Sequence, residues 1–285
     1  MRPSLGFDAY APKEIAERVE AVCIAKASTP LLSLVMLGIL AGAFIGLGSL
    51  FYVIVASDSS LGFAASRLLG GAAFSLGLFL VVVAGAELFT GNNLLAMAWA
   101  HGCMTTREVL HNWVVVCAAN FVGAAGLAAI VILSGHTDMN SGAIGRTYLQ
   151  IAAAKSSLPF WTAFFRGVLC NVLVCMAVWM TLAGRSLVDK FVAILMPIAA
   201  FVAAGFEHSI ANMYFLTLAV MLQAAAGEAV HISGLWRNLV PVLAGNILGG
   251  SVLVALVYYV IYRRVPKVQE AGSRVRSGGG DRTGS

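Results

Sequence analysis

Four ionisable residues interrupt the apolar runs of this 285-residue chain: Glu87, Arg166, Glu207 and His208. Such groups are costly inside a membrane, so they are default candidates for a functional site. His208 stands out, because an imidazole can donate a hydrogen bond to an anion and can exchange a proton near neutral pH. Thr90 adds a hydroxyl group close to Glu87. These residue types predict a site for a small anion and a proton.

The two glutamates belong to a repeated motif, G-x-E-x4-N, and each copy interrupts a long apolar run. A second motif, N-x7-N-x2-G, follows each copy. The paired motif residues are Gly85, Glu87 and Asn92 with Gly205, Glu207 and Asn212, then Asn112, Asn120 and Gly123 with Asn238, Asn246 and Gly249. Polar interruptions at matching places in two halves of a chain point to a substrate site near the midplane of a transporter or channel.

Each of these polar residues also has a structural interpretation. For Glu87 and Glu207 we prefer the structural interpretation. Their carboxylates would accept hydrogen bonds from backbone N–H groups that an interrupted helix leaves free, or pair with an asparagine of the other repeat. For His208 we prefer a functional role over a neutral imidazole bonded to the backbone. Asn171 and Asn246 lie within apolar helices. The sequence is equally consistent with interhelical hydrogen bonding and with pore lining as the role of these two residues.

Long uncharged runs set the class of protein. The chain is 60% hydrophobic and 11% charged, whereas soluble domains are about 25% charged. A membrane span needs about 20 apolar residues. Six candidate spans cover residues 30–56, 67–99, 109–134, 156–183, 191–222 and 237–262. The second and fifth are too long for one straight helix, so each is predicted to be two half-helices around an unwound segment.

The distribution of positive charge predicts the orientation. Most of the 18 lysine and arginine residues lie in the two termini and in the second and fourth loops, so both termini are expected on the cytoplasmic side. Three spans per repeat place the second repeat upside down in the membrane. The predicted protein is therefore an all-α, multi-pass inner-membrane protein.

Three segments follow from this plan. Residues 1–28 form a cytoplasmic segment with an amphipathic helix over residues 11–27, residues 29–264 form the membrane domain, and residues 265–285 form a disordered basic tail. The five cysteines show no C-x-x-C motif, so neither a disulfide framework, a metal site nor a cofactor is expected. The net charge of +5 reflects the cytoplasmic bias and the tail, not nucleic-acid binding.

Four segments resemble the formate/nitrite transporter family. They are residues 84–91 (AGAELFTG), 170–175 (CNVLVC), 205–212 (GFEHSIAN) and 245–250 (GNILGG), and the similarity extends over about residues 8–264. The resemblance implies an aquaporin-like protomer of six helices, assembled as a homopentamer with one pore per subunit. It also implies passage of formate, nitrite or hydrosulfide across the bilayer, with or without a proton. Of these three anions, formate is the substrate that we expect.

The resemblance also implies roles for individual residues. His208 and Thr90 would face each other at the pore centre, supported by Glu207, Asn171, Asn246 and Glu87. Lys155 would draw anions into the vestibule. Five apolar residues would narrow the pore at two constrictions. The implied constrictions are Leu78, Leu88 and Phe89 on one side and Phe74 with Phe201 on the other.

Other classes fit the sequence less well. An intramembrane hydrolase would use Ser209, but adjacent serine and histidine residues rarely form the required hydrogen bond, and no G-x-S-x-G motif occurs. A water or glycerol channel would carry twin Asn-Pro-Ala motifs, which are absent. An ammonium channel would carry more helices and paired membrane histidines. The chain is therefore expected not to be an enzyme.

Overall fold

The computed structural model describes residues 9–228 and 232–264, and within them the chain is entirely helical outside turns and loops. The tail expected over residues 265–285 lies outside the described residues, as do residues 1–8. The helices are α1 (Pro12–Ala27), α2 (Leu31–Ala56), α3 (Phe63–Ala84), α4 (Leu95–Ala100), α5 (Thr106–Leu133), α6 (Ala143–Ser156), α7 (Phe160–Thr181), α8 (Leu187–Ala203), α9 (Ser209–Ala225), α10 (Ser233–Ile247) and α11 (Val257–Tyr262).

Five helical stretches of the described chain are long and apolar enough to cross a membrane. Four of them are α2, α3, α5 and α7, and the fifth is a continuous 30-residue stretch over Ser233–Tyr262. In that stretch a π-helical segment, η3 (Leu248–Leu256), joins α10 to α11. The helix α9 is also apolar but shorter.

Two non-helical segments lie inside the apolar bundle, and each has a glycine at or next to its first residue. α3 ends at Ala84, and the chain becomes helical again in the 3₁₀ turn η1 (Gly91–Leu94) that leads into α4. α8 ends at Ala203 and α9 begins at Ser209. Gly85 and Gly205 have φ angles of 73° and 72°, a left-handed conformation that glycine adopts without the steric cost of a Cβ atom. We call residues 85–90 and 204–208 the first and second breaks.

The long helices pack closely because glycine replaces a larger residue where they cross. A Cβ atom on Gly123 of α5 would overlap the carbonyl of Ile39 in α2, and one on Gly249 of η3 would overlap the carbonyl of Val168 in α7. These two crossings are repeat counterparts, since Gly123 and Gly249 end the two N-x7-N-x2-G motifs. Small residues of this kind permit close helix approach in membranes.

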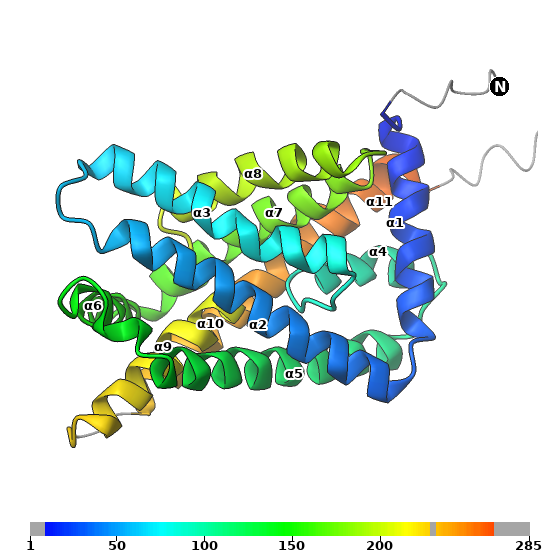
Figure 1. The fold of residues 1–285 in the computed structure, drawn as a ribbon. Helices are drawn as coiled ribbons and strands as arrows, with labels where there is room; N and C mark the ends of the chain where they lie inside the picture. Colours follow the sequence, from blue (N-terminus) through cyan, green and yellow to red (C-terminus); the bar gives the residue numbers. More distant parts are fainter. Residues whose placement is uncertain (1–8, 229–231, 265–285) are drawn as a thin grey trace, which may run out of the picture.

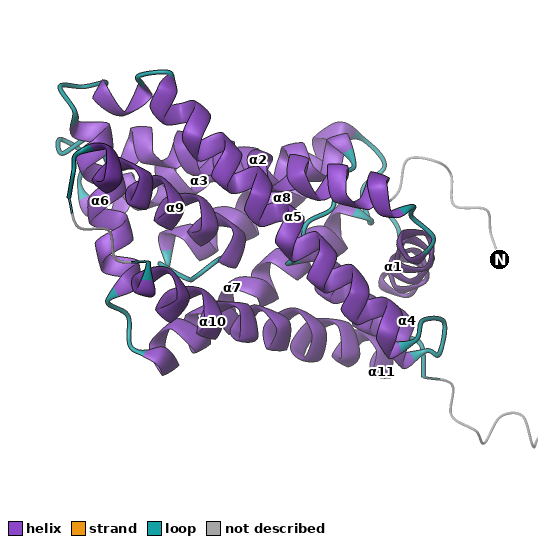
Figure 2. Cartoon of the chain, turned by 90° about the horizontal axis from the view of Figure 1, so that it is seen from below, coloured by secondary structure: helices purple, strands orange, loops and turns teal. Residues whose placement is uncertain are grey.

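The two shorter amphipathic helices lie at opposite ends of the bundle. In Figure 1, α6 lies at one end and α1 crosses the other, while α2, α3 and α5 run between them. The view from below gives the same arrangement (Figure 2). α1 carries Lys26 in its last turn and α6 carries Lys155 in its last turn. Each end of the bundle therefore presents one lysine from an amphipathic helix.

Candidate functional site

The two breaks meet at Thr90 and His208. Oγ1 of Thr90 lies 3.1 Å from Nε2 of His208, and both residues are buried. They come from opposite halves of the chain, 118 positions apart. The pair is the point at which the two interrupted regions share a hydrogen bond.

The backbone fixes the orientation of the His208 ring. Its Nδ1 accepts a hydrogen bond of 3.2 Å from the backbone N–H of Ala211, so the side chain caps the N-terminus of α9. A neutral imidazole with Nδ1 as acceptor carries its proton on Nε2. Nε2–H therefore points at Thr90 and is the donor available to a ligand that displaces the threonine hydroxyl.

Asn246 holds the second break in shape. Its amide nitrogen donates to the carbonyls of Gly167 and Glu207, at 2.8 and 3.1 Å, while its Oδ1 accepts from the N–H of Ser209 at 3.0 Å. The N–H of Glu207 donates to the carbonyl of Arg166. The backbone groups freed by the break are thus satisfied by an amide side chain and a neighbouring helix, which a buried break requires.

Asn120 does the same for the first break. Its amide nitrogen donates to the carbonyls of Gly38 and Glu87, at 2.7 and 2.9 Å, and its Oδ1 accepts from the N–H of Phe89 at 2.9 Å. The N–H of Glu87 donates to the carbonyl of Leu37. Asn120 belongs to the repeated N-x7-N-x2-G motif, but the motif alone does not indicate that this side chain supports the first break.

Lys155, rather than the freed N–H groups, pairs with the carboxylate of Glu207. Nζ of Lys155 lies 3.0 and 3.1 Å from the two carboxylate oxygens. The amides of Asn212 and Asn238 donate to Oε2 at 2.6 and 3.3 Å. Both asparagines belong to the same repeat as Glu207, which differs from the expected pairing with the other repeat.

Lys26 forms the equivalent cluster at the other end of the bundle. Its Nζ donates to Oε2 of Glu87 at 2.9 Å and to Oδ1 of Asn92 at 2.7 Å. The amide of Asn92 donates to Glu87 at 2.7 Å and to Asn112 at 2.9 Å. In the sequence Lys26 is one of the basic residues before the first span, and its pairing with Glu87 brings together residues 61 positions apart.

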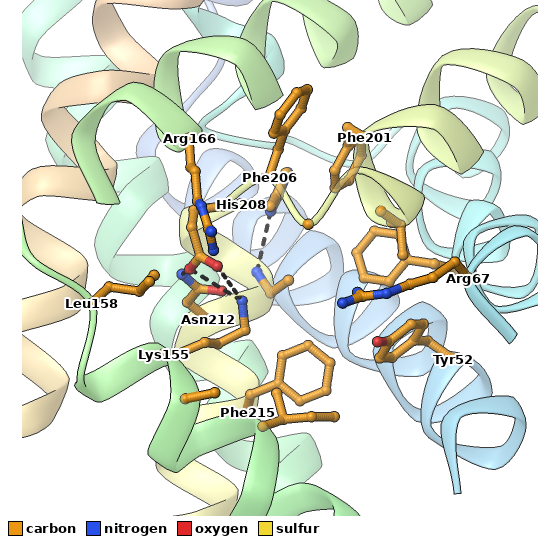
Figure 3. Close-up of a pocket in the computed structure, with 17 residues that line it drawn as sticks. Tyr52, Arg67, Lys155, Leu158, Arg166, Phe201, Phe206, His208, Asn212 and Phe215 are labelled. Carbon is orange, nitrogen blue, oxygen red and sulfur yellow. Dashed lines mark hydrogen bonds and ion pairs between the residues drawn. The ribbon is translucent and has the colours of Figure 1, made fainter. Parts of the chain in front are cut away.

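A pocket with three cations leads to His208 from the α6 end, and we call it the Lys155 pocket. Lys155, Arg67 and Arg166 line it with one carboxylate, that of Glu207. Figure 3 shows Lys155, Arg67, Arg166 and His208 around the same cavity. Arg166 makes no ion pair or hydrogen bond through its side chain within the described chain. The pocket has an excess of positive charge.

Two aromatic rings line the Lys155 pocket beside His208. Phe74 and Phe201 pack edge to face with centroids 5.6 Å apart, and both line the pocket. The Phe201 ring stacks on the imidazole of His208 at 5.9 Å. An ion that reaches His208 from this side exchanges part of its hydration shell for contact with these aromatic rings.

A second pocket approaches from the α1 end, and we call it the Lys26 pocket. Lys26 and Glu87 line it together with Leu78 and Leu88. Leu88 is the repeat counterpart of His208, so the two pockets end on matching positions of the two breaks. Phe89 is buried but lines neither pocket.

Asn171 connects the Thr90 backbone to α10. Its amide nitrogen lies 3.2 Å from the carbonyl of Thr90 and 2.7 Å from that of Asn246, and it also donates to Asn93. The residue is fully buried and lines neither pocket. Asn171 and Asn246 therefore both use their amides to hold neighbouring backbone.

The sequence profile that matches the chain is that of the formate/nitrite transporter family, over residues 13–260. This chain belongs to the formate/nitrite transporter family. The match covers most of the chain and confirms the resemblance carried by the four segments around the breaks. As a member of this family with several membrane-length helices, the chain is an all-α, multi-pass membrane protein.

Curated relatives and solved structures agree with the family. The chain is 38% identical over 280 residues to the formate channel FocA of Escherichia coli strain K12, covering 93% of this chain and 98% of that protein. It is 35% identical to the formate channel FocB of the same strain, covering 93% and 99%. A solved "pentameric formate channel with formate bound" is 37% identical, with a TM-score of 0.75 over 82% of this chain and 98% of that one.

The geometry of this family member gives no support to a serine hydrolase. Ser209 Oγ is buried and has no hydrogen-bond partner among the described residues. Both ring nitrogens of His208 are engaged elsewhere, with Thr90 and Ala211. A serine nucleophile needs a base within hydrogen-bond reach. The relatives are likewise named as channels or transporters.

Proposed function

We propose that this chain is a channel for small monovalent anions, with formate as the preferred substrate and nitrite or hydrosulfide as alternatives. The observation that carries the proposal is the Thr90–His208 pair: His208 lines the Lys155 pocket, and the two residues Leu88 and Gly91 near Thr90 line the Lys26 pocket. Two polar donors at the end of apolar approaches suit a small anion. The names of the formate channel relatives favour formate.

The pathway would begin in the Lys155 pocket. Its three cations and one carboxylate raise the local concentration of anions. The anion would then pass Phe74 and Phe201 to reach His208 and Thr90, and leave past Leu88 and Leu78 into the Lys26 pocket. A bare anion in such an apolar passage loses solvation that is worth several kcal/mol, so hydrogen bonds or a proton must compensate at the centre.

His208 would supply the compensation through Nε2. A formate ion that displaces the Thr90 hydroxyl receives a hydrogen bond from Nε2–H, and the Thr90 hydroxyl can donate a second one. Proton transfer needs an imidazolium, which forms if His208 takes a proton from water in the Lys155 pocket and Nδ1 gives up its bond to the N–H of Ala211. The imidazolium can then pass its Nε2 proton to formate, so that formic acid leaves as a neutral molecule, the imidazole is neutral again, and one proton accompanies one anion. Glu87, Glu207, Asn171 and Asn246 would support the two breaks.

The membrane arrangement belongs to the same proposal. We infer six spans in two inverted three-span repeats, with α3 and α4 forming the second span and α8 and α9 the fifth. The matched contacts of Asn120 and Asn246 support this pairing of the repeats. Both termini would be cytoplasmic, the location would be the bacterial inner membrane, and the assembly a homopentamer, as in the pentameric neighbour.

A flux panel tests the function directly. The purified protein in liposomes should pass formate at a higher rate than acetate or chloride, with nitrite and hydrosulfide measured in the same panel. External pH recorded with the flux reports whether a proton accompanies the anion. Liposomes without protein give the background for neutral formic acid. Formate flux at the background rate would overturn the proposal.

A further inference from the structure

A second cluster of titratable side chains lies at the α1 end of the bundle, away from the pathway proposed above. Glu20 comes from α1, His101 follows the last residue of α4, and Cys103 lies in the turn before α5. Arg263, just after α11, completes the cluster. Neither the Lys155 pocket nor the Lys26 pocket includes any of these residues.

Three ligand-type atoms converge on one point in this cluster. Oε1 of Glu20 lies 2.6 Å from Nδ1 of His101 and 3.5 Å from Sγ of Cys103. All three atoms lie within 4.8 Å of one another. The other carboxylate oxygen, Oε2, accepts a hydrogen bond of 2.7 Å from Nε of Arg263. The carboxylate is thus oriented with Oε1 toward the imidazole and the thiol.

We propose that Glu20, His101 and Cys103 bind a divalent transition metal ion, with zinc as the best match. Imidazole nitrogen, thiolate sulfur and carboxylate oxygen are the three ligand types of protein zinc sites. Tetrahedral bonds of about 2.0–2.3 Å separate such ligand atoms by roughly 3.3–3.6 Å. The distance between Cys103 and Glu20 already fits, and the distance between His101 and Glu20 must open by under about 1 Å.

The surroundings suit a metal bound at the surface. The Glu20 side chain is 8% exposed, whereas that of His101 is 34% exposed and Cys103 is exposed. The short segment that carries His101 and Cys103 can therefore adjust, and water can occupy the fourth position. Arg263 would hold the free carboxylate oxygen, the kind of outer contact that orients metal-binding groups.

A bound metal would fasten α1 to the turn between α4 and α5. α1 also places Val19, Cys23 and Lys26 on the wall of the Lys26 pocket. The metal would therefore stabilise the position of α1 in which Lys26 reaches Glu87. The cysteine spacing predicts no metal site, because it contains no C-x-x-C motif. The cluster is not visible in the sequence, since Glu20 lies 81 positions before His101 and the His-x-Cys pair alone is too short to be a motif.

Cobalt(II) is a direct probe, since its complexes with thiolate ligands absorb in the near ultraviolet and visible. Titration of the full-length protein in detergent should give saturable absorption at one Co2+ per chain, removed by excess Zn2+. Cys103→Ser and His101→Gln should abolish the thiolate band. Cys117→Ser and His136→Gln change a cysteine and a histidine outside the cluster, and they should leave it unchanged. No saturable binding, or equal binding by Cys103→Ser, would overturn the proposal.

Protection of the native thiol tests the same point without a variant. Zn2+ should slow alkylation of Cys103 by a maleimide and leave the slower reaction of the half-buried Cys117 unchanged. It should also raise the unfolding temperature of the wild-type protein, because a ligand that binds the folded state stabilises it. Alkylation of Cys103 at the same rate with and without Zn2+ would show that the cluster is an ion-paired network alone.

Discussion

Nζ of Lys155 lies 3.0 Å from Oε1 of Glu207, and the two side chains are only 16% and 5% exposed. Lys155, which the family resemblance implies would draw anions into the vestibule, is therefore paired with a buried carboxylate. Lys26 and Glu87 repeat the relationship at the other end of the bundle, at 2.9 Å. The two lysines are separated by the same number of positions as Gly38 and Gly167, whose carbonyls accept from Asn120 and Asn246 at matching places in the two repeats.

Replacement of Lys155 should affect both stability and transport. Lys155→Ala leaves the buried carboxylate of Glu207 without its counter-charge, which costs on the order of 3–5 kcal/mol in a buried pair. It also removes a cation from the pocket, so formate uptake should slow by about 2–5-fold at low ionic strength, with a smaller effect at high salt. Thermal unfolding in detergent and liposome flux measure the two effects.

Two further variants separate these effects. Glu207→Gln combined with Lys155→Ala removes both charges and should recover most of the lost stability. Arg146→Ala changes an exposed cation on the same helix, α6; among the described residues, the Arg146 side chain donates only to the backbone carbonyl of Ser141. It should leave both measurements unchanged. Uptake by Lys155→Ala equal to wild type at low salt would contradict the vestibule role.

Replacement of His208 tests the chemistry at the centre. In His208→Asn the new side chain can still accept the N–H of Ala211, because asparagine is a favourable helix N-cap residue. It can also donate to an anion, but it does not titrate. Proton-coupled formate uptake should fall by about tenfold or more, and a passive leak of the anion can remain.

The pH profile decides the outcome for His208. Wild-type uptake should rise as the external pH falls, and uptake should make the external solution more alkaline. His208→Asn should lose both properties. A variant with the wild-type rate and an unchanged pH profile would show that His208 is a structural residue that caps α9.

The inverted arrangement of the repeats is tested by labelling from one side. Ser141 and Ser186 are both exposed, and the proposed topology puts them on opposite sides of the membrane. Ser141→Cys should react with an impermeant thiol reagent added outside intact cells, and Ser186→Cys should react only after permeabilisation. The background needs Cys103 and Cys117 replaced by serine, since the other three cysteines are buried. Equal labelling of both positions would rule out six spans.

The support of the breaks predicts that Asn120 is as important as Asn246. Asn120→Leu orphans two backbone carbonyls and one N–H group, and each such buried group costs about 1–3 kcal/mol. The variant should unfold at a markedly lower temperature, and Asn246→Leu should match it because the contacts match. Gln150→Leu, at an exposed position of α6, is the control. A strong effect at Asn246 with none at Asn120 would contradict the equivalence of the breaks.

The sequence by itself determined the class, the family and the places where helices stop. Long uncharged runs have few stable alternatives to membrane helices, because a bilayer leaves backbone groups no other partners. The two copies of the G-x-E-x4-N motif lie where α3 and α8 end, and their glycines, Gly85 and Gly205, adopt positive φ angles. These properties depend on residues close together in the chain, and a local pattern is sufficient to reveal them.

The partners of the polar groups were decided only by the tertiary structure. The motifs predict that the carboxylates of Glu87 and Glu207 accept the freed N–H groups. In the structure the N–H groups of Phe89 and Ser209 donate to Asn120 and Asn246 instead. The carboxylates pair with Lys26 and Lys155. Several acceptors compete for each donor in a buried network. The acceptor that each donor binds is determined by how helices distant in sequence cross, and a local motif contains no information about that crossing.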